Sequence, residues 1–312
     1  MKVLVTGASG LLGTDIVLEL IASGHEVIKS SFSERPGFIA ADVSLESGIE
    51  KLAAIDWDCI IHTSAARDPD SCEKDREGTY NLNVKASEEL AKIASAKKAK
   101  FVFISTDYVF SGNNPPYRET DKPDPINCYG ETKLEAENLI LSICTDAIIL
   151  RVSILYGISA GLKASALLYS SIKAIKSKTE VFIEDVIARY PVYTGDVAKA
   201  IGFLLRKKAS GIYHFSSDDK LTKYQIALMI ASVTGKNSSH IRPLKTLPET
   251  PAKRPLDSHL DTSKIFSLGM KTLSHLAKVL PHSRIDWSSR DRIRECSCKR
   301  RRRVMMPLWN II

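Results

Sequence analysis

Apolar positions along the first half of the chain follow two patterns, which alternate along the sequence. Short runs rich in β-branched and aromatic residues have the pattern of buried strands, and the segments between them carry apolar residues at helical spacing. The pattern predicts strands at 2–6, 25–29, 58–62, 101–104 and 147–152, and helices at 10–22, 44–52, 81–96 and 126–143. Ser44 is the expected cap of the helix at 44–52. Alternating strands and helices predict an α/β fold with a Rossmann-type, doubly wound parallel sheet.

The second half of the chain has a looser pattern. It predicts helices at 165–177 and 194–205, a strand at 211–215, and a helix to Val233 that opens on the capping-box pair Thr222 and Gln225. A smaller lobe of this kind closes over the carboxyl ends of the strands, where doubly wound sheets bind ligands. We therefore expect three parts: a Rossmann domain at 1–155, a smaller C-terminal lobe for substrate or partner at 156–281, whose helix at 194–206 can pack back on the sheet, and a basic, disordered tail at 282–312.

A glycine-rich turn joins the first strand to the first helix. The three glycines, Gly7, Gly10 and Gly13, have separate roles in such a turn: the first permits the tight bend, the second lets a pyrophosphate approach, and the third lets the helix pack on the strand. Backbone N–H groups at the start of the helix, including those of Leu11 and Leu12, face the phosphates. In this strand–turn–helix context the glycines predict a dinucleotide site.

The segment that ends the second strand bears on the choice of dinucleotide. An acidic residue there binds the ribose of NAD, whereas NADP requires a cation for its 2′-phosphate. Lys29, Ser31 and Arg35 lie in this segment and can hold a 2′-phosphate, so NADP is favoured and NAD remains possible. Asp42 follows a short third strand and is expected near the adenine. Ala65 follows the strand at 58–62 and is expected beside the dinucleotide.

A tyrosine and a lysine form the candidate catalytic pair. Tyr129 and Lys133 are four residues apart, so on a helix they share one face. A nearby ammonium favours phenolate, which would bring the tyrosine closer to acid–base work at neutral pH. The lysine can also hold the nicotinamide ribose. Thr106 ends a predicted strand, where its hydroxyl could polarise a substrate carbonyl.

These motifs together resemble the extended short-chain dehydrogenases/reductases, whose catalytic triad would correspond to Thr106, Tyr129 and Lys133. The segments 105–112, 116–119 and 129–135 are similar to the dTDP-4-dehydrorhamnose reductase branch of that family. Within the branch, the chain most resembles the regulatory beta subunits of methionine adenosyltransferase. That likeness extends over roughly residues 1–270 and rests on the segments 113–119, 151–157, 221–224, 238–243, 253–255 and 260–264.

The resemblance implies an NADP-binding regulatory subunit that docks on a methionine adenosyltransferase catalytic subunit and modulates S-adenosylmethionine synthesis. The alternative is an NADPH-dependent reductase of a nucleotide-linked 4-keto-6-deoxy sugar, because the whole triad is present. Ile154 stands where the bacterial reductases usually carry a tryptophan, and this favours the regulatory reading. A sugar-nucleotide epimerase is a third reading, which the absence of an acidic residue at the end of the second strand disfavours.

Charge and cysteine content limit the partners, the bound groups and the compartment that we expect for the protein. Residues 282–312 hold nine Lys/Arg and three Asp/Glu, a net charge of +6, which leaves the other 281 residues only +2 of the formal +8. Nucleic acid is therefore an unlikely partner of the body of the protein, although the tail could serve such a role. Cysteine spacing indicates neither a disulfide framework nor a metal site. No apolar run is long enough for a bilayer, and we expect a cytoplasmic protein without membrane contact.

Overall fold

The computed structural model describes residues 1–157, 165–247, 249–271, 274 and 276, so the tail predicted at 282–312 lies outside the described residues. Within them, a parallel sheet contains seven strands in the order β10-β6-β5-β4-β1-β2-β3. The strands of this sheet are β1 (Lys2–Thr6), β2 (Glu26–Ser31), β3 (Ile39–Ala40), β4 (Cys59–His62), β5 (Lys100–Thr106), β6 (Ile148–Val152) and β10 (Gly211–Phe215). The predicted Rossmann-type parallel sheet is thus confirmed.

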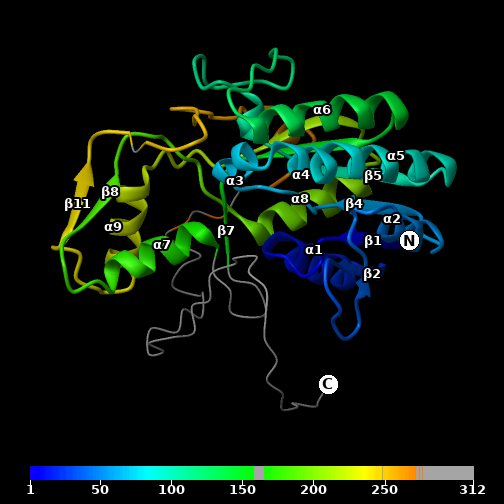
Figure 1. The fold of residues 1–312 in the computed structure, drawn as a ribbon, viewed down its shortest axis with the longest axis horizontal. Helices are drawn as coiled ribbons and strands as arrows, with labels where there is room; N and C mark the ends of the chain where they lie inside the picture. Colours follow the sequence, from blue (N-terminus) through cyan, green and yellow to red (C-terminus); the bar gives the residue numbers. More distant parts are fainter. Residues whose placement is uncertain (158–164, 248, 272–273, 275, 277–312) are drawn as a thin grey trace.

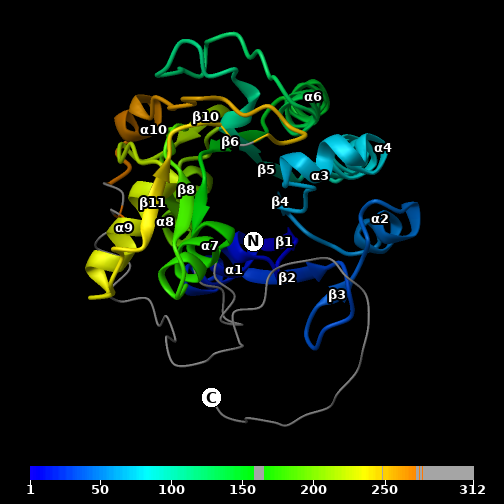
Figure 2. The ribbon, with the colours of Figure 1, turned by 60° about the vertical axis from the view of Figure 1, so that its left-hand side comes forward.

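Helices cover both faces of the sheet (Figures 1 and 2). One face packs on α1 (Leu11–Ala22) and α8 (Thr194–Arg206), in a core that contains Val3, Ile16 and Ile201. The other face packs on α2 (Glu46–Ala53), α5 (Ala86–Ala96) and α6 (Cys128–Ile143), in a core that contains Leu4 and Phe103. Val3 and Leu4 lie in different cores because successive side chains of a strand point to opposite faces.

Two predicted helix starts differ from the structure. The N-cap of α2 is Leu45, not Ser44, and the hydroxyl of Ser44 donates instead to Asp42 at 2.6 Å. The helix predicted from residue 81 begins with a π-helical turn, η1 (Asn81–Lys85), ahead of α5. Short helices α3 (Pro69–Lys74) and α4 (Arg76–Tyr80) precede that turn, a feature that the hydrophobic period does not reveal.

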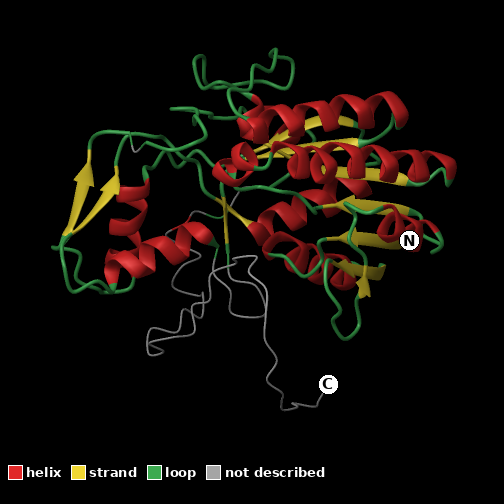
Figure 3. Cartoon of the chain, viewed as in Figure 1, coloured by secondary structure: helices red, strands yellow, loops and turns green. Residues whose placement is uncertain are grey.

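The chain after β6 alternates between the sheet and a smaller lobe (Figure 3). The lobe has a core of its own, built from α7 (Ala166–Ile175), α9 (Lys223–Val233) and the parallel pair β8 (Val181–Glu184) and β11 (Ile241–Leu244). Between them, α8 and β10 return to the sheet. The two-stranded pair β7 (Leu155–Tyr156) and β9 (Val192–Tyr193) connects the two regions, and α10 (Ser263–Ser267) lies beside β10.

The direction in which successive strands are added to the sheet reverses beside β1, which makes this place a topological switch point. The chain runs from β1 outward through β2 and β3, then crosses to β4 on the other side of β1, where Thr6 pairs with His62. Doubly wound sheets bind ligands at such a point, outside the carboxyl ends of the strands. None of the helices in the described part of the chain combines the length and the apolar character that crossing a bilayer requires.

Candidate functional site

The glycine turn after β1 has the shape that close packing demands. Gly7 has φ +64°, and a Cβ there would lie 2.7 Å from the Thr63 hydroxyl oxygen. A Cβ at Gly13 would lie 2.3 Å from the Gly7 carbonyl oxygen, so only glycine lets α1 approach the turn. A Cβ at Gly10 would meet nothing within 4 Å except that carbonyl, at 3.0 Å. Neighbouring atoms therefore occupy the space beside Gly7 and Gly13, whereas the space beside Gly10 is largely free. The N–H groups of the first helical turn have no partner within the helix, so they are suited to bind a phosphate.

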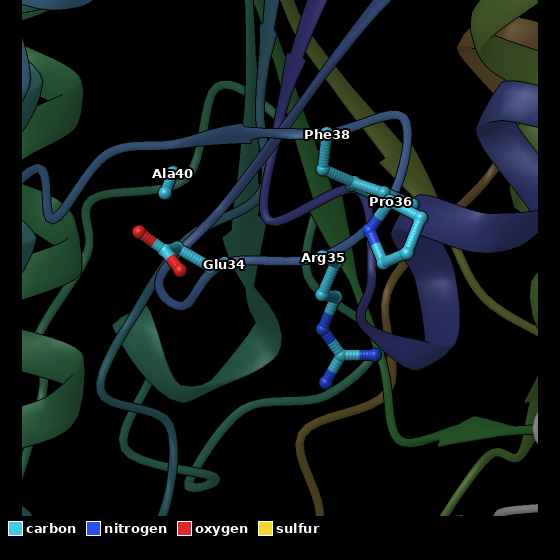
Figure 4. Close-up of a pocket in the computed structure, with 5 residues that line it drawn as sticks. All are labelled: Glu34, Arg35, Pro36, Phe38 and Ala40. Carbon is cyan, nitrogen blue, oxygen red and sulfur yellow. The ribbon is translucent and has the colours of Figure 1, made fainter. Parts of the chain in front are cut away.

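A hollow of about 470 Å³ lies beyond the end of β2, and its lining includes Glu34 and Arg35 (Figure 4). The Arg35 guanidinium points away from the Glu34 carboxylate. Lys29 lies over the ring of Phe38, 4.9 Å from its centroid, beside the same hollow. Cations at this place fit a 2′-phosphate. Ser31 is less suited than its position suggested, because its buried hydroxyl donates to the Ser33 carbonyl oxygen at 2.7 Å.

Asp42 and Ala65, which were also expected near the dinucleotide, lie in loops that follow strands of the sheet. The Asp42 carboxylate accepts hydrogen bonds from the Ser44 amide and hydroxyl, so it closes the turn before α2. Ala65 is half-buried in the loop after β4. Asn83 fixes this loop, because its side chain exchanges hydrogen bonds of 2.8 and 2.9 Å with the backbone of Ala66. The loop is thereby held at the carboxyl edge of the sheet.

The triad residues come together at the start of α6. The Asn127 side chain caps this helix by accepting from the Gly130 amide, and a Cβ at Gly130 would lie 2.1 Å from the Tyr108 carbonyl oxygen. Because this contact brings α6 against the turn that follows β5, Tyr129 lies close enough to Thr106 for the Thr106 hydroxyl to act on the pKa of its phenol. Lys133 follows one helical turn later and is 2% exposed.

Burial dominates the titration of this pair. Burial raises the pKa of Tyr129 well above the ordinary 10.0, and the nearby Thr106 hydroxyl only partly opposes this effect. It lowers the pKa of Lys133 from 10.5 to about 7, although the nearby Glu137 acts in the opposite direction. The expected lowering of the Tyr129 pKa by the lysine is therefore wrong for the protein alone, since desolvation of the phenolate outweighs a lysine that is itself largely deprotonated above pH 7.

Sequence reasoning missed an acid beside the triad. Asp107 is buried, which raises the pKa of its carboxyl to about 6, and the Ser258 hydroxyl donates to it at 2.6 Å. The Arg254 guanidinium forms an ion pair of 2.7 Å with Asp70 of α3. These contacts hold the segment around residues 252–261 across the carboxyl edge of the sheet. The partners are 151 and 184 residues apart in the chain, so no local pattern could have indicated them.

His62, at the end of β4, was not among the predicted site residues. It is buried, its Nδ1 lies 2.7 Å from the Thr6 hydroxyl oxygen, and its Nε2 has no hydrogen-bond partner among the described residues. Burial and the neighbouring Lys133 lower the pKa of His62 to about 3. The imidazole is therefore neutral at physiological pH.

The fold and this constellation define a short-chain dehydrogenase/reductase of the extended type. Residues 1–284 match the family described as RmlD substrate binding domain. The chain belongs to that family. The match includes both the sheet and the smaller lobe.

Proteins similar to the chain include a subunit of methionine adenosyltransferase and reductases. The chain is 36% identical over 277 residues to methionine adenosyltransferase 2 subunit beta of Bos taurus, an alignment that covers 86% of this chain and 83% of that protein. It is 33% identical over 275 residues to the probable low-salt glycan biosynthesis reductase Agl14 of Haloferax volcanii, with coverage of 85% and 91%. The solved structure of dTDP-4-dehydrorhamnose reductase from Bacillus anthracis in complex with NADP superimposes with a TM-score of 0.80 at 26% identity, covering 90% of this chain and 96% of that one.

Proposed function

We propose that the protein is an NADP-binding regulatory subunit of methionine adenosyltransferase, which binds the catalytic subunit and modulates S-adenosylmethionine synthesis. The observation that carries the proposal is the 36% identity to a methionine adenosyltransferase beta subunit across 86% of the chain. An alignment of 277 residues is too long to rest on the Rossmann domain alone, so it also includes the smaller lobe. Fold alone would not assign this function.

The residues at the carboxyl edge of the sheet fit a dinucleotide. The open turn at Gly10 and the N-terminus of α1 would hold the pyrophosphate, and Arg35 with Lys29 would hold the 2′-phosphate. Lys133 would hold the nicotinamide ribose. In a reductase, bound NADPH supplies a hydride, whereas a regulatory subunit needs only the binding.

Association and rate measurements test the regulatory proposal. The purified protein is mixed with a methionine adenosyltransferase catalytic subunit, with and without NADP, and both complex formation and the rate of S-adenosylmethionine synthesis are measured. We expect a complex at micromolar concentration and a changed rate. Gly7→Ala should lose NADP binding because the added Cβ meets the Thr63 hydroxyl, whereas Gly24→Ala, at φ +78° with nothing within 4 Å, is the matched control. Absence of association under both conditions would refute the proposal.

A reductase of a nucleotide-linked 4-keto-6-deoxy sugar is the second candidate, because Thr106, Tyr129 and Lys133 lie together. Thr106 would orient the substrate carbonyl and Tyr129 would give its phenolic proton to the carbonyl oxygen. NADPH oxidation is measured with the keto sugar for wild type and Tyr129→Phe, with Tyr80→Phe, an exposed tyrosine of α4, as the control. Equal rates for wild type and Tyr129→Phe would reject this mechanism.

A further inference from the structure

Lys133 carries an amine in an apolar setting. The side chain is buried on the face of the sheet covered by α5 and α6, and its Nζ lies 3.7 Å from the centroid of the Phe103 ring. An ammonium over a ring face is attracted by the negative face of the π-system, and the attraction is strongest where water is excluded. The ring therefore compensates part of the hydration that Lys133 loses.

The Phe103 ring is itself held in place. It stacks on His62 at a centroid distance of 5.9 Å and an interplanar angle of 20°, and the Thr6 hydroxyl fixes the imidazole from the other side. His62 is neutral because burial lowers its pKa to about 3, so it places no second positive charge beside the lysine. The neutral imidazole thus supports the Phe103 ring without adding a positive charge beside Lys133.

Glu137 lies one helical turn beyond Lys133 and is paired with Arg151. Arg151 binds it through Nε and Nη2, with the shortest distance 2.6 Å, and the Ser105 hydroxyl donates to it as well. Arg151 in turn lies 3.3 Å from Nε2 of His214. Since these donors hold the carboxylate, it acts on Lys133 through its charge and from a fixed position.

We propose that Phe103 and Glu137 are positioning residues that keep Lys133 cationic and directed toward the bound dinucleotide. The proposal rests on the dinucleotide binding proposed above. An ammonium has three hydrogen-bond donors for the ribose and an attraction to the anionic cofactor, whereas a neutral amine has weaker donors and no charge.

The other titratable groups near the Lys133 amine do not take over the role of Phe103 and Glu137 in keeping it cationic. Tyr129, on the same helix, is protonated at neutral pH because burial raises its pKa, and His62, on β4, is neutral. Asp107, in the turn after β5, is a buried acid whose carboxyl oxygens accept hydrogen bonds from the Ser258 and Thr106 hydroxyls. Glu137 is the acid that raises the pKa of Lys133.

NADPH binding as a function of pH tests the proposal. Dissociation constants are measured by fluorescence between about pH 5.5 and 9 for wild type, Phe103→Leu and Phe101→Leu. Phe101 is the matched control because it is fully buried on the same strand and in the same core and packs edge-on against His62, whereas the Lys133 amine lies over the Phe103 ring. In wild type we expect affinity to fall as pH rises through the pKa of Lys133 in the free protein, about 7. In Phe103→Leu the fall should begin about one pH unit lower, and in Phe101→Leu it should not move.

A second readout does not depend on the cofactor. The Lys133 signal of ε-¹³C-lysine-labelled protein, assigned with Lys133→Arg, is titrated by NMR without ligand in the same variants. The midpoint should again move down for Phe103→Leu and for Glu137→Gln. If Glu137→Gln does not fold because it leaves the buried Arg151 without its counter-charge, Phe103→Leu decides, and its fold is checked by circular dichroism.

The outcomes separate the two proposals. If wild type binds NADPH at no pH, the proposed dinucleotide function fails, while the NMR midpoints still test the positioning of Lys133. If wild type binds NADPH but Phe103→Leu and Phe101→Leu titrate alike in both measurements, Phe103 has no special effect on the lysine and the inference is overturned.

Discussion

Replacing Lys133 by methionine should stabilise the protein. The lysine is 2% exposed, and burial lowers its pKa from 10.5 to about 7. The difference is about 3.5 pKa units at about 1.36 kcal/mol each, so folding with a charged Lys133 costs about 5 kcal/mol. Methionine keeps a similar chain length and apolar contacts without the charge, so this cost disappears.

The gain should depend on pH in a defined direction. In the unfolded chain the lysine is charged below pH 10.5, and in the folded protein it is neutral above about pH 7. Wild-type stability therefore rises with pH between these two values, because the unfolded state binds more protons there. The advantage of Lys133→Met should be about 5 kcal/mol below pH 7, about 2 kcal/mol at pH 9, and near zero above pH 10.5.

Urea denaturation at a series of pH values measures this advantage. Lys51→Met, at an exposed position of α2, is the control and should change stability by less than about 0.5 kcal/mol at every pH. The stabilised Lys133→Met protein should also bind NADPH more weakly, which shows that its gain comes from the site. A gain that is equal at pH 6 and pH 9, or no gain at all, would refute the reasoning.

Three further substitutions test contacts that stabilise the fold: the glycine turn, the cap of α9 and the Glu137–Arg151 ion pair. Gly13→Ala should destabilise the protein by about 3 kcal/mol in urea and abolish NADPH binding, because the new Cβ would lie 2.3 Å from the Gly7 carbonyl oxygen. Thr222→Ala removes the capping box of α9 and should cost about 1 kcal/mol in the same assay. Glu137→Gln should cost about 3–5 kcal/mol because it leaves the buried Arg151 without its counter-charge. The double variant with Arg151→Met should recover most of that loss, and a double variant less stable than the single one would contradict this account.

Much of the fold follows from local pattern in the sequence. The main strands and helices up to β6 follow from short apolar runs and from the helical period of 3.6, and the glycine turn is recognised from residues that are adjacent in the chain. The capping box at Thr222 is likewise local, and the structure shows both of its hydrogen bonds. Local sequence does not determine that α8 and β10 return to the sheet. An amphipathic helix, for example, does not indicate which apolar surface it will pack against.

In the candidate site too, some features follow from local sequence and others depend on the tertiary fold. Spacing alone places Tyr129 and Lys133 on one face of α6, but it does not show how deeply each is buried, and burial sets both pKa values. The Ser258 hydroxyl that binds Asp107 comes from a segment 151 residues away, and its contact depends on the whole tertiary fold. Sequence could therefore indicate the candidate pair Tyr129 and Lys133 without giving the protonation of either residue.

Protonation is what relates the site to its two proposed functions. A phenol whose pKa lies above its ordinary value keeps its proton at neutral pH, so Tyr129 is suited to give a proton to a carbonyl oxygen and unsuited to take one from an alcohol. If the protein turns over substrate, this arrangement therefore favours reduction over oxidation. A regulatory subunit needs no proton from Tyr129, yet it still needs a charged Lys133 to hold the dinucleotide. The two functions thus share their requirement at Lys133 and differ at Tyr129, where loss of the hydroxyl removes the chemistry and leaves the binding.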